Sequence, residues 1–204
     1  RVGYAVFPNS VAGKTIQKTV LAYASECWSA ASAPSQAAAA LALSSAKTTT
    51  LPIGVAMDSY RASVRCLHHI CTTRLYHALK DFGLEVAQPG GAFYLYPSFR
   101  PYAAQLQQRG IHTSQALSKW LVKNHGLATL PGSAFGEKDE REGLGGGSYR
   151  LRMATSYLYF SSEEEKYEKG FYLLNAAATG KTVDLPLLEK AVDCIRRAVE
   201  ELQS

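Results

Sequence analysis

The amino-acid sequence predicts an α+β fold, in which a small mixed or antiparallel sheet is covered by helices. One strand-like segment opens the chain, a block of helical segments follows, and strands and helices interleave in the second half. This order favours a mixed α/β arrangement over a doubly wound parallel sheet, in which strands and helices alternate throughout. The length of 204 residues and the hydrophobic content of 47% are sufficient for a sizeable core.

Composition and charge exclude several classes of protein. A net charge of +5 is too small, and the apolar content too high, for a chain that is mainly disordered. The longest weakly polar run, residues 29–45, breaks at Pro34 and falls short of the roughly 20 apolar residues that a membrane span needs. The 22 basic residues are scattered among 17 acidic ones, whereas a nucleic-acid binder gathers its basic residues on one face. We therefore expect neither a membrane nor a nucleic acid as partner.

The cysteines and the first residues indicate the cellular compartment. Cys27, Cys66, Cys71 and Cys194 lack the paired spacing of a disulfide framework or a zinc ribbon. They lie in apolar, helix-like stretches, which is typical of reduced thiols in a reducing compartment. The chain opens inside a strand-like segment without a secretory leader. We expect a cytoplasmic protein in which further residues precede Arg1.

The first half of the chain is predicted to be mainly helical. Residues 1–8 alternate in polarity and indicate a strand, and Ser10 can cap a helix over residues 11–28. A second helix, over residues 34–43, is almost free of charge and is expected to be buried. After a polar connection over residues 44–52, apolar side chains at three- and four-residue steps predict a long amphipathic helix that ends at Gly83. The members of this apolar stripe are Tyr60, Val64, Leu67, Cys71, Leu75, Leu79 and Phe82.

The second half alternates between short strands and helices. A helix is predicted over residues 114–124, and a final one over residues 186–202 has Leu188, Val192, Ile195, Val199 and Leu202 on one face. Residues 161–164 begin another helix, because serines suit a cap and acids suit the positive end of the helix dipole. Residues 137–148, rich in charge and glycine, are expected to form a mobile loop. The predicted strands are residues 84–87, 92–97, 127–130 and 149–159.

Three sequence patterns suggest chemistry but fail on closer inspection. The triplets Gly13-Lys14-Thr15 and Gly180-Lys181-Thr182 lack the upstream glycine of a phosphate-binding loop, since Pro8 and Asn175 occupy that position. The glycine-rich residues 143–147 lack the preceding strand and following helix of a dinucleotide fingerprint. Cys66, His68, His69 and Cys71 resemble a metal cluster, but at about 100° per residue the two cysteines point about 140° apart on a helix. We therefore expect Cys71 to belong to the core and no metal to bind.

Four short segments, in order, resemble the C-terminal half of class I/II aminotransferases, the pyridoxal-phosphate enzymes of the aspartate aminotransferase fold. The family has an arginine-glycine-aromatic segment after its cofactor lysine, a serine-x-proline-x-glutamine helix start, a proline-x-glycine-alanine-phenylalanine strand, and a proline-glycine turn followed by an arginine-leucine strand. The matching segments are Arg1-Val2-Gly3-Tyr4, residues 32–38, residues 89–95, and residues 130–136 together with residues 149–155.

The resemblance implies roles for two arginines. Arg150 matches the arginine that binds the α-carboxylate of the substrate, a role that suits a guanidinium able to grip both oxygens at once. Arg152 lies on the same side of the strand by alternation and is the alternative. Arg1 matches the arginine that contacts the phosphate of the cofactor, pyridoxal 5'-phosphate.

The resemblance also implies that the chain is part of a larger enzyme. The Schiff-base lysine is expected upstream of Arg1, so no catalytic residue is assigned in this chain, which is expected to be inactive alone. Residues 1–45 correspond to the end of the cofactor-binding large domain and residues 46–204 to the small domain. The missing N-terminal large domain is an expected partner, and the parent enzyme, which transfers an amino group between an amino acid and a 2-oxo acid, is expected to be a homodimer.

Substrate choice and the alternative functions rest on few residues. Dicarboxylate-specific members carry a second arginine just before the serine-x-proline segment, whereas this chain has Glu26-Cys27-Trp28-Ser29 there. This difference favours an apolar or aromatic amino donor. A lyase of the same fold and a regulatory effector-binding domain are the alternatives within the fold, and an unrelated binding module is the alternative outside it.

Overall fold

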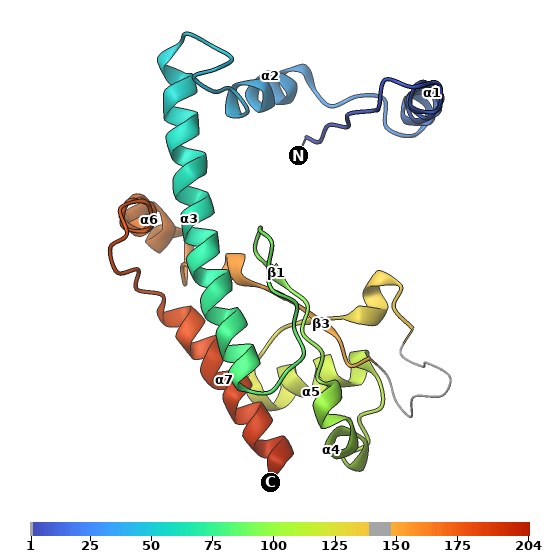
Figure 1. Cartoon of the computed structure of the whole chain (residues 1–204), viewed down its shortest axis with the longest axis vertical. Helices are drawn as coiled ribbons and strands as arrows, with labels where there is room; N and C mark the ends of the chain where they lie inside the picture. The colour runs from blue at the N-terminus through green and yellow to red at the C-terminus, as the bar shows by residue number, and fades with distance from the viewer. Residues whose placement is uncertain (1, 139–147) are drawn as a thin grey trace. The chain divides into compact units, whose positions relative to one another are not determined.

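The computed structural model describes residues 2–138 and 148–204. The chain divides into two compact units, Arg1–Arg61 and Ala62–Ser204 (Figure 1). Helices and a small antiparallel sheet make up the structure, which confirms the predicted α+β class. The predicted boundary between the domains, after residue 45, stays a prediction.

The first unit contains α1 (Val11–Cys27), α2 (Ala33–Ala42) and the first turns of α3 (Pro52–Asp81). As predicted, Ser10 caps α1: its hydroxyl accepts a hydrogen bond from the amide of Gly13 at 3.1 Å. Two predictions are wrong. Residues 2–8 form no strand, because a strand needs a partner to pair with its backbone. No residue of α2 is buried, because an uncharged helix is buried only where another element packs against it.

Side chains of α3 hold the connection that follows α2. The Asp58 carboxylate accepts a hydrogen bond from the Ala46 amide at 2.8 Å. The Arg61 guanidinium donates to the Ala42 carbonyl at 2.6 Å and to the Ser44 carbonyl at 2.7 Å. The Ala46 amide, followed by the Arg61 guanidinium, lowers the pKa of Asp58. The polar connection is therefore tied to the start of α3.

The second unit packs a hydrophobic core between the rest of α3, α4 (Ala103–Gln108), α5 (Ser114–His125), α6 (Glu163–Ala178) and α7 (Pro186–Gln203). Arg74 of α3 makes a two-pronged contact with Glu189 of α7, at 3.0 and 2.7 Å, so these two helices lie side by side. The predicted inward faces of α3 and α7 are confirmed in this unit, where Val64 and Phe82 are half-buried, but Tyr60, which was predicted on the same stripe, is exposed in the first unit. The buried members are Leu67, Cys71, Leu75, Leu79, Leu188, Val192, Ile195, Val199 and Leu202.

The ends of these helices follow from local chemistry. Gly83, with φ at 75°, follows the end of α3, as predicted. Ser162 caps α6 and accepts a hydrogen bond from the Glu165 amide at 3.2 Å, which confirms the predicted start. The Glu165 carboxylate in turn accepts from the hydroxyl and amide of Ser161 and from Lys169, and these bonds lower the pKa of Glu165 to about 2. The short helix α4 was not predicted.

The sheet has three antiparallel strands in the order β1 (Tyr94–Leu95), β3 (Leu151–Ala154), β2 (Leu130–Pro131). Tyr94 pairs with Ala154 and Leu130 with Arg152. All strands are shorter than predicted: the segment of residues 84–87 contributes only a single bridge, between Glu85 and Ser98. The segment of residues 149–159 leaves the sheet after Ala154 and turns into a 3-10 helix at Thr155–Tyr157, in which Thr155 is buried and Tyr157 is exposed.

None of the helices in the described ranges is long and apolar enough to cross a membrane. In the same ranges, no group of three or more histidine, cysteine, aspartate or glutamate side chains is placed to hold a metal ion.

The cysteines occupy two kinds of environment. Cys27 and Cys66 are exposed, whereas Cys71 and Cys194 are buried, so the prediction that Cys71 belongs to the core is confirmed. Burial raises the pKa of the Cys71 thiol to about 11, against the opposing effect of hydrogen bonds with Thr155 and Tyr159. A thiol with a raised pKa stays protonated at neutral pH and is a poor nucleophile.

Alkylation of the folded chain with iodoacetamide at pH 8 should therefore label Cys27 and Cys66 first. We expect Cys71 to react at least about tenfold more slowly, since only the thiolate attacks and the protein hides the sulfur. Peptide mass spectrometry over a time course measures the four rates, and the same reaction in urea, where the four rates converge, is the control. Labelling of Cys71 as fast as Cys66 in the folded chain would contradict its burial.

Candidate functional site

The exposed face of the sheet carries a group of aromatic and basic side chains. Leu95, Leu151 and Met153 are buried, so their neighbours along each strand point to the opposite side. We call this side the outer face of the sheet, defined by Tyr94, Tyr96, Arg150 and Arg152. The prediction that Arg150 and Arg152 lie on the same side of the strand is confirmed.

Arg150 faces a carboxylate on the outer face. Its Nε lies 3.5 Å from Oε1 of Glu137, and its guanidinium carbon lies 5.9 Å from the centre of the Tyr96 ring. The Arg150 side chain is 42% exposed, whereas that of Glu137 is 19% exposed. A half-exposed guanidinium on an open surface is accessible to an anion from solution.

Glu137 is held in place from the other side. The Tyr96 hydroxyl donates a hydrogen bond of 2.6 Å to Oε2 of Glu137. A Cβ atom at Gly132 would lie 2.6 Å from both the Tyr96 hydroxyl and this same carboxylate oxygen. The Gly132 amide donates to the Arg150 carbonyl at 2.9 Å, which brings the turn close to the strand. Because Gly132 has no side chain, the Tyr96 hydroxyl and the Glu137 carboxylate have room to form their hydrogen bond.

A strained residue precedes Arg150. Tyr149 has a φ of 47°, in the left-handed region that residues with a bulky side chain rarely adopt. Its side chain is fully buried, its hydroxyl donates to the Ile111 carbonyl at 3.1 Å, and its own carbonyl accepts from the Phe99 amide at 3.0 Å. Such strain persists where surrounding contacts hold it, and it is often found beside functional residues. Here the strained residue is buried directly before the half-exposed Arg150.

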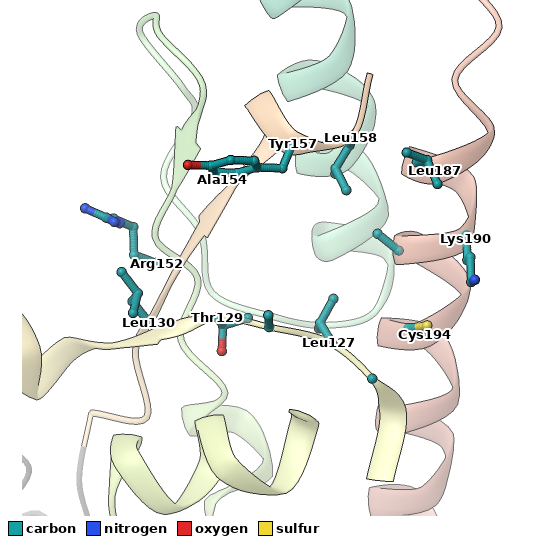
Figure 2. Close-up of a pocket in the computed structure, with 13 residues that line it drawn as sticks. Leu127, Thr129, Leu130, Arg152, Ala154, Tyr157, Leu158, Leu187, Lys190 and Cys194 are labelled. Carbon is teal, nitrogen blue, oxygen red and sulfur yellow. The ribbon is translucent and has the colours of Figure 1, made fainter. Parts of the chain in front are cut away.

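Arg152 has a different environment from Arg150. Its guanidinium carbon lies 4.5 Å from the centre of the Tyr94 ring and 4.6 Å from that of Phe135, so two aromatic rings hold it. Figure 2 shows the Arg152 side chain directed away from α7, at the edge of a cavity of about 560 Å³. Leucines and the side of α7 that bears Cys194 line most of this cavity. The guanidinium of Arg152 thus lies against two aromatic rings at the edge of a cavity, whereas that of Arg150 faces a carboxylate.

A second polar group lies between α3 and the segment after β3. Nδ1 of His68 is 2.5 Å from the Tyr159 hydroxyl, and Thr72 donates to the His68 carbonyl at 2.6 Å. Burial lowers the pKa of His68 and raises that of Tyr159, so both groups stay neutral at pH 7. His68 therefore belongs to a neutral hydrogen-bonded pair, and the exposed Cys66 lies apart from the buried Cys71.

The structure also explains the first glycine-lysine-threonine triplet. A Cβ atom at Gly13 would lie 2.0 Å from the Pro8 carbonyl oxygen. The glycine is thus required by the close approach of the preceding turn to α1.

The resemblance singles out Arg150, but no sequence pattern predicts Tyr96, Gly132 and Glu137 as its neighbours. The alternation of residues 92–97 placed Tyr96 on the face of Tyr94, and Glu137 directly follows the proline-glycine turn, yet neither pattern shows that the two meet. Arg1 lies outside the described residues, as do residues 139–147 of the predicted mobile loop.

The chain is similar to known proteins over part of its length. Residues 1–156 match the family described as "Aminotransferase class I and II". The chain is 30% identical over 91 residues to aromatic-amino-acid aminotransferase 2 of Thermococcus litoralis, covering 45% of this chain and 20% of that protein. It is 32% identical over 98 residues to an aspartate aminotransferase of Pinus pinaster, covering 47% of this chain and 18% of that protein. The solved structure of the aromatic aminotransferase from Pyrococcus horikoshii aligns with a TM-score of 0.41 at 22% identity, covering 67% of this chain and 25% of that one.

The chain therefore belongs to the class I and II aminotransferases. It spans about a fifth of the length of the curated relatives it matches. The family depends on pyridoxal phosphate, a cofactor carried on a lysine. The guanidinium of Arg150 on the outer face suits the binding of a carboxylate, and Lys190 lines the cavity beside Arg152.

Replacing Gly132 by alanine tests the geometry around Arg150. The added Cβ should push the Tyr96 hydroxyl and the Glu137 carboxylate apart, with a loss of about 1 kcal/mol in the free energy of unfolding, the value of one hydrogen bond. Urea denaturation measures this loss. Gly170→Ala is the matched control, since its Cβ would meet only an ordinary contact at 3.7 Å inside α6, where alanine favours the helix. A Gly132→Ala chain as stable as the original would contradict the described contact.

Proposed function

We propose that this chain is the C-terminal part of a pyridoxal-phosphate-dependent aminotransferase, and that Arg150 binds the α-carboxylate of the amino acid and 2-oxo acid substrates. The observation that carries this proposal is the contact of Arg150 with the Glu137 carboxylate on an open surface. The guanidinium already faces a carboxylate, it is exposed enough to exchange partners, and the matched family transfers amino groups between molecules that carry this group.

The role of Arg150 is to bind and orient. A planar guanidinium can donate two parallel hydrogen bonds to a carboxylate, which fixes the direction of the bound amino acid as well as neutralising its charge. The strained backbone at Tyr149 and the buried Leu151 on either side hold the base of this side chain. Precise placement of a reacting group is a large part of enzymatic rate enhancement. The cofactor, when bound, supplies the electron sink for amino-group transfer.

Further parts of the proposal rest on the resemblance described above. Arg1 contacts the cofactor phosphate, the Schiff-base lysine lies upstream, and residues 1–45 belong to the large domain. An apolar or aromatic amino acid is the favoured donor. The parent is a homodimer, a proposal that gains support from the exposed Val11, Ile16 and Trp28 of the first unit, since large exposed apolar side chains often mark an interface.

Replacing Arg150 by lysine in the full-length enzyme tests the assignment of the carboxylate site. Lysine keeps the charge but loses the two-pronged grip, and a hydrogen bond to a charged group is worth about 1.5–3 kcal/mol. We expect kcat/KM to fall at least about tenfold, with unchanged cofactor absorbance and folding. Arg152→Lys, the matched replacement on the same strand, should cost less, because two rings hold that side chain. A larger loss of kcat/KM in Arg152→Lys than in Arg150→Lys would assign the site to Arg152. If neither variant changes kcat/KM, the carboxylate site does not lie on this strand.

A second test concerns the isolated chain of residues 1–204. Because we place the Schiff-base lysine upstream, this chain should bind no stoichiometric pyridoxal phosphate through a lysine. Incubation with the cofactor, reduction with borohydride and peptide mapping measure the labelling, with the full-length enzyme as the positive control. A stoichiometric label on one lysine of this chain would show that the fragment is self-sufficient.

A further inference from the structure

Arg150 is already paired with a carboxylate that belongs to the protein. The pair joins Nε of Arg150 to Oε1 of Glu137 at 3.5 Å. This separation is longer than the roughly 2.7–2.9 Å of a tight charge-assisted hydrogen bond, so the contact is electrostatic and loose. A substrate carboxylate that grips the guanidinium through two nitrogens can form shorter bonds than Glu137 does.

Glu137 has its own support, which is independent of Arg150. The Tyr96 hydroxyl donates to Oε2 at 2.6 Å, and the space above Gly132 accommodates this contact. The carboxylate therefore keeps a partner when another anion reaches Arg150. Because Glu137 keeps its hydrogen bond from Tyr96, it can lose its contact with Arg150 without becoming an unpaired carboxylate.

We propose that Glu137 is an internal competitor for the carboxylate site: it occupies Arg150 in the absence of substrate and weakens the binding of every substrate carboxylate. This inference rests on the proposed function of Arg150. Glu137 acts through Arg150 and sets the affinity of the carboxylate site without taking part in the chemical step. Its negative charge sets how strongly a ligand carboxylate must bind to displace it.

The alternative is that Glu137 positions Arg150. The two roles differ in the sign of the effect when the charge of Glu137 is removed. A competitor, once neutralised, releases the guanidinium, so carboxylates bind more tightly and KM falls. A positioning group, once neutralised, loosens the guanidinium, so KM rises or kcat falls.

The test uses the full-length enzyme with Glu137→Gln, which keeps the shape and an oxygen that can accept from Tyr96. Two quantities are measured: kcat and KM for the amino acid that the enzyme turns over fastest, and the inhibition constant of propionate, a carboxylate without an amino group. We expect KM and the inhibition constant each to fall about twofold to fivefold, the value of an ion pair near the surface, while kcat stays unchanged.

Two further variants keep the test decisive. Glu137→Ala should shift both constants in the same direction, because it also removes the charge. Glu200→Gln is the matched control: Glu200 lies on α7, pairs with Arg196 at 2.7 Å, and should change neither constant. Raised or unchanged constants in both Glu137 variants overturn the proposal.

The outcome separates this inference from the proposed function. If Arg150→Lys lowers kcat/KM but the Glu137 variants leave KM and the inhibition constant unchanged, Arg150 binds the carboxylate and Glu137 does not compete. If Arg150→Lys leaves kcat/KM unchanged, the proposed carboxylate site itself is wrong, regardless of the constants measured for the Glu137 variants.

Discussion

The burial of one face of β3 is the constraint on which the candidate site depends. Leu151 and Met153 enter the core from this central strand, and the alternation of side chains then leaves Arg150 and Arg152 no place except the outer face. A shift of one residue would turn both arginines into the core without partners, which is strongly unfavourable for a group that is always charged. The core thus fixes the register of the strand, and the register exposes the arginines.

Neighbouring chain segments then give the two arginines different surroundings. The turn after β2 brings Phe135 against Arg152 and Glu137 against Arg150 within three residues of sequence. Aromatic rings hold a guanidinium without neutralising it, whereas a carboxylate offers it a counter-charge that a ligand can replace. Two identical side chains on one strand therefore have different surroundings because of a turn that precedes the strand in the sequence.

Local sequence patterns predicted the positions of the longer helices but not the extents of the strands. The apolar steps from Leu67 to Leu79 and the serine cap before Glu163 predicted helices whose hydrogen bonds close within a few residues. Strands depend on partners remote in sequence, so the predicted strand at residues 1–8 is absent, and the strand at residues 149–159 is confined to Leu151–Ala154. The prediction that α2 is buried is wrong for the same reason, because a helix is buried only where another element packs against it.

The sequence by itself determined the family, the α+β class, the order of the helices other than α4, and the presence of two arginines on one side of a strand. These features follow from motifs, from helical periodicity and from alternation, all of which act between residues close in the chain. Only the tertiary structure decided that Tyr96, Gly132 and Glu137 meet beside Arg150. That meeting requires two antiparallel pairings around β3 and the strained backbone of Tyr149, and such contacts depend on the packing of the whole unit rather than on any local pattern.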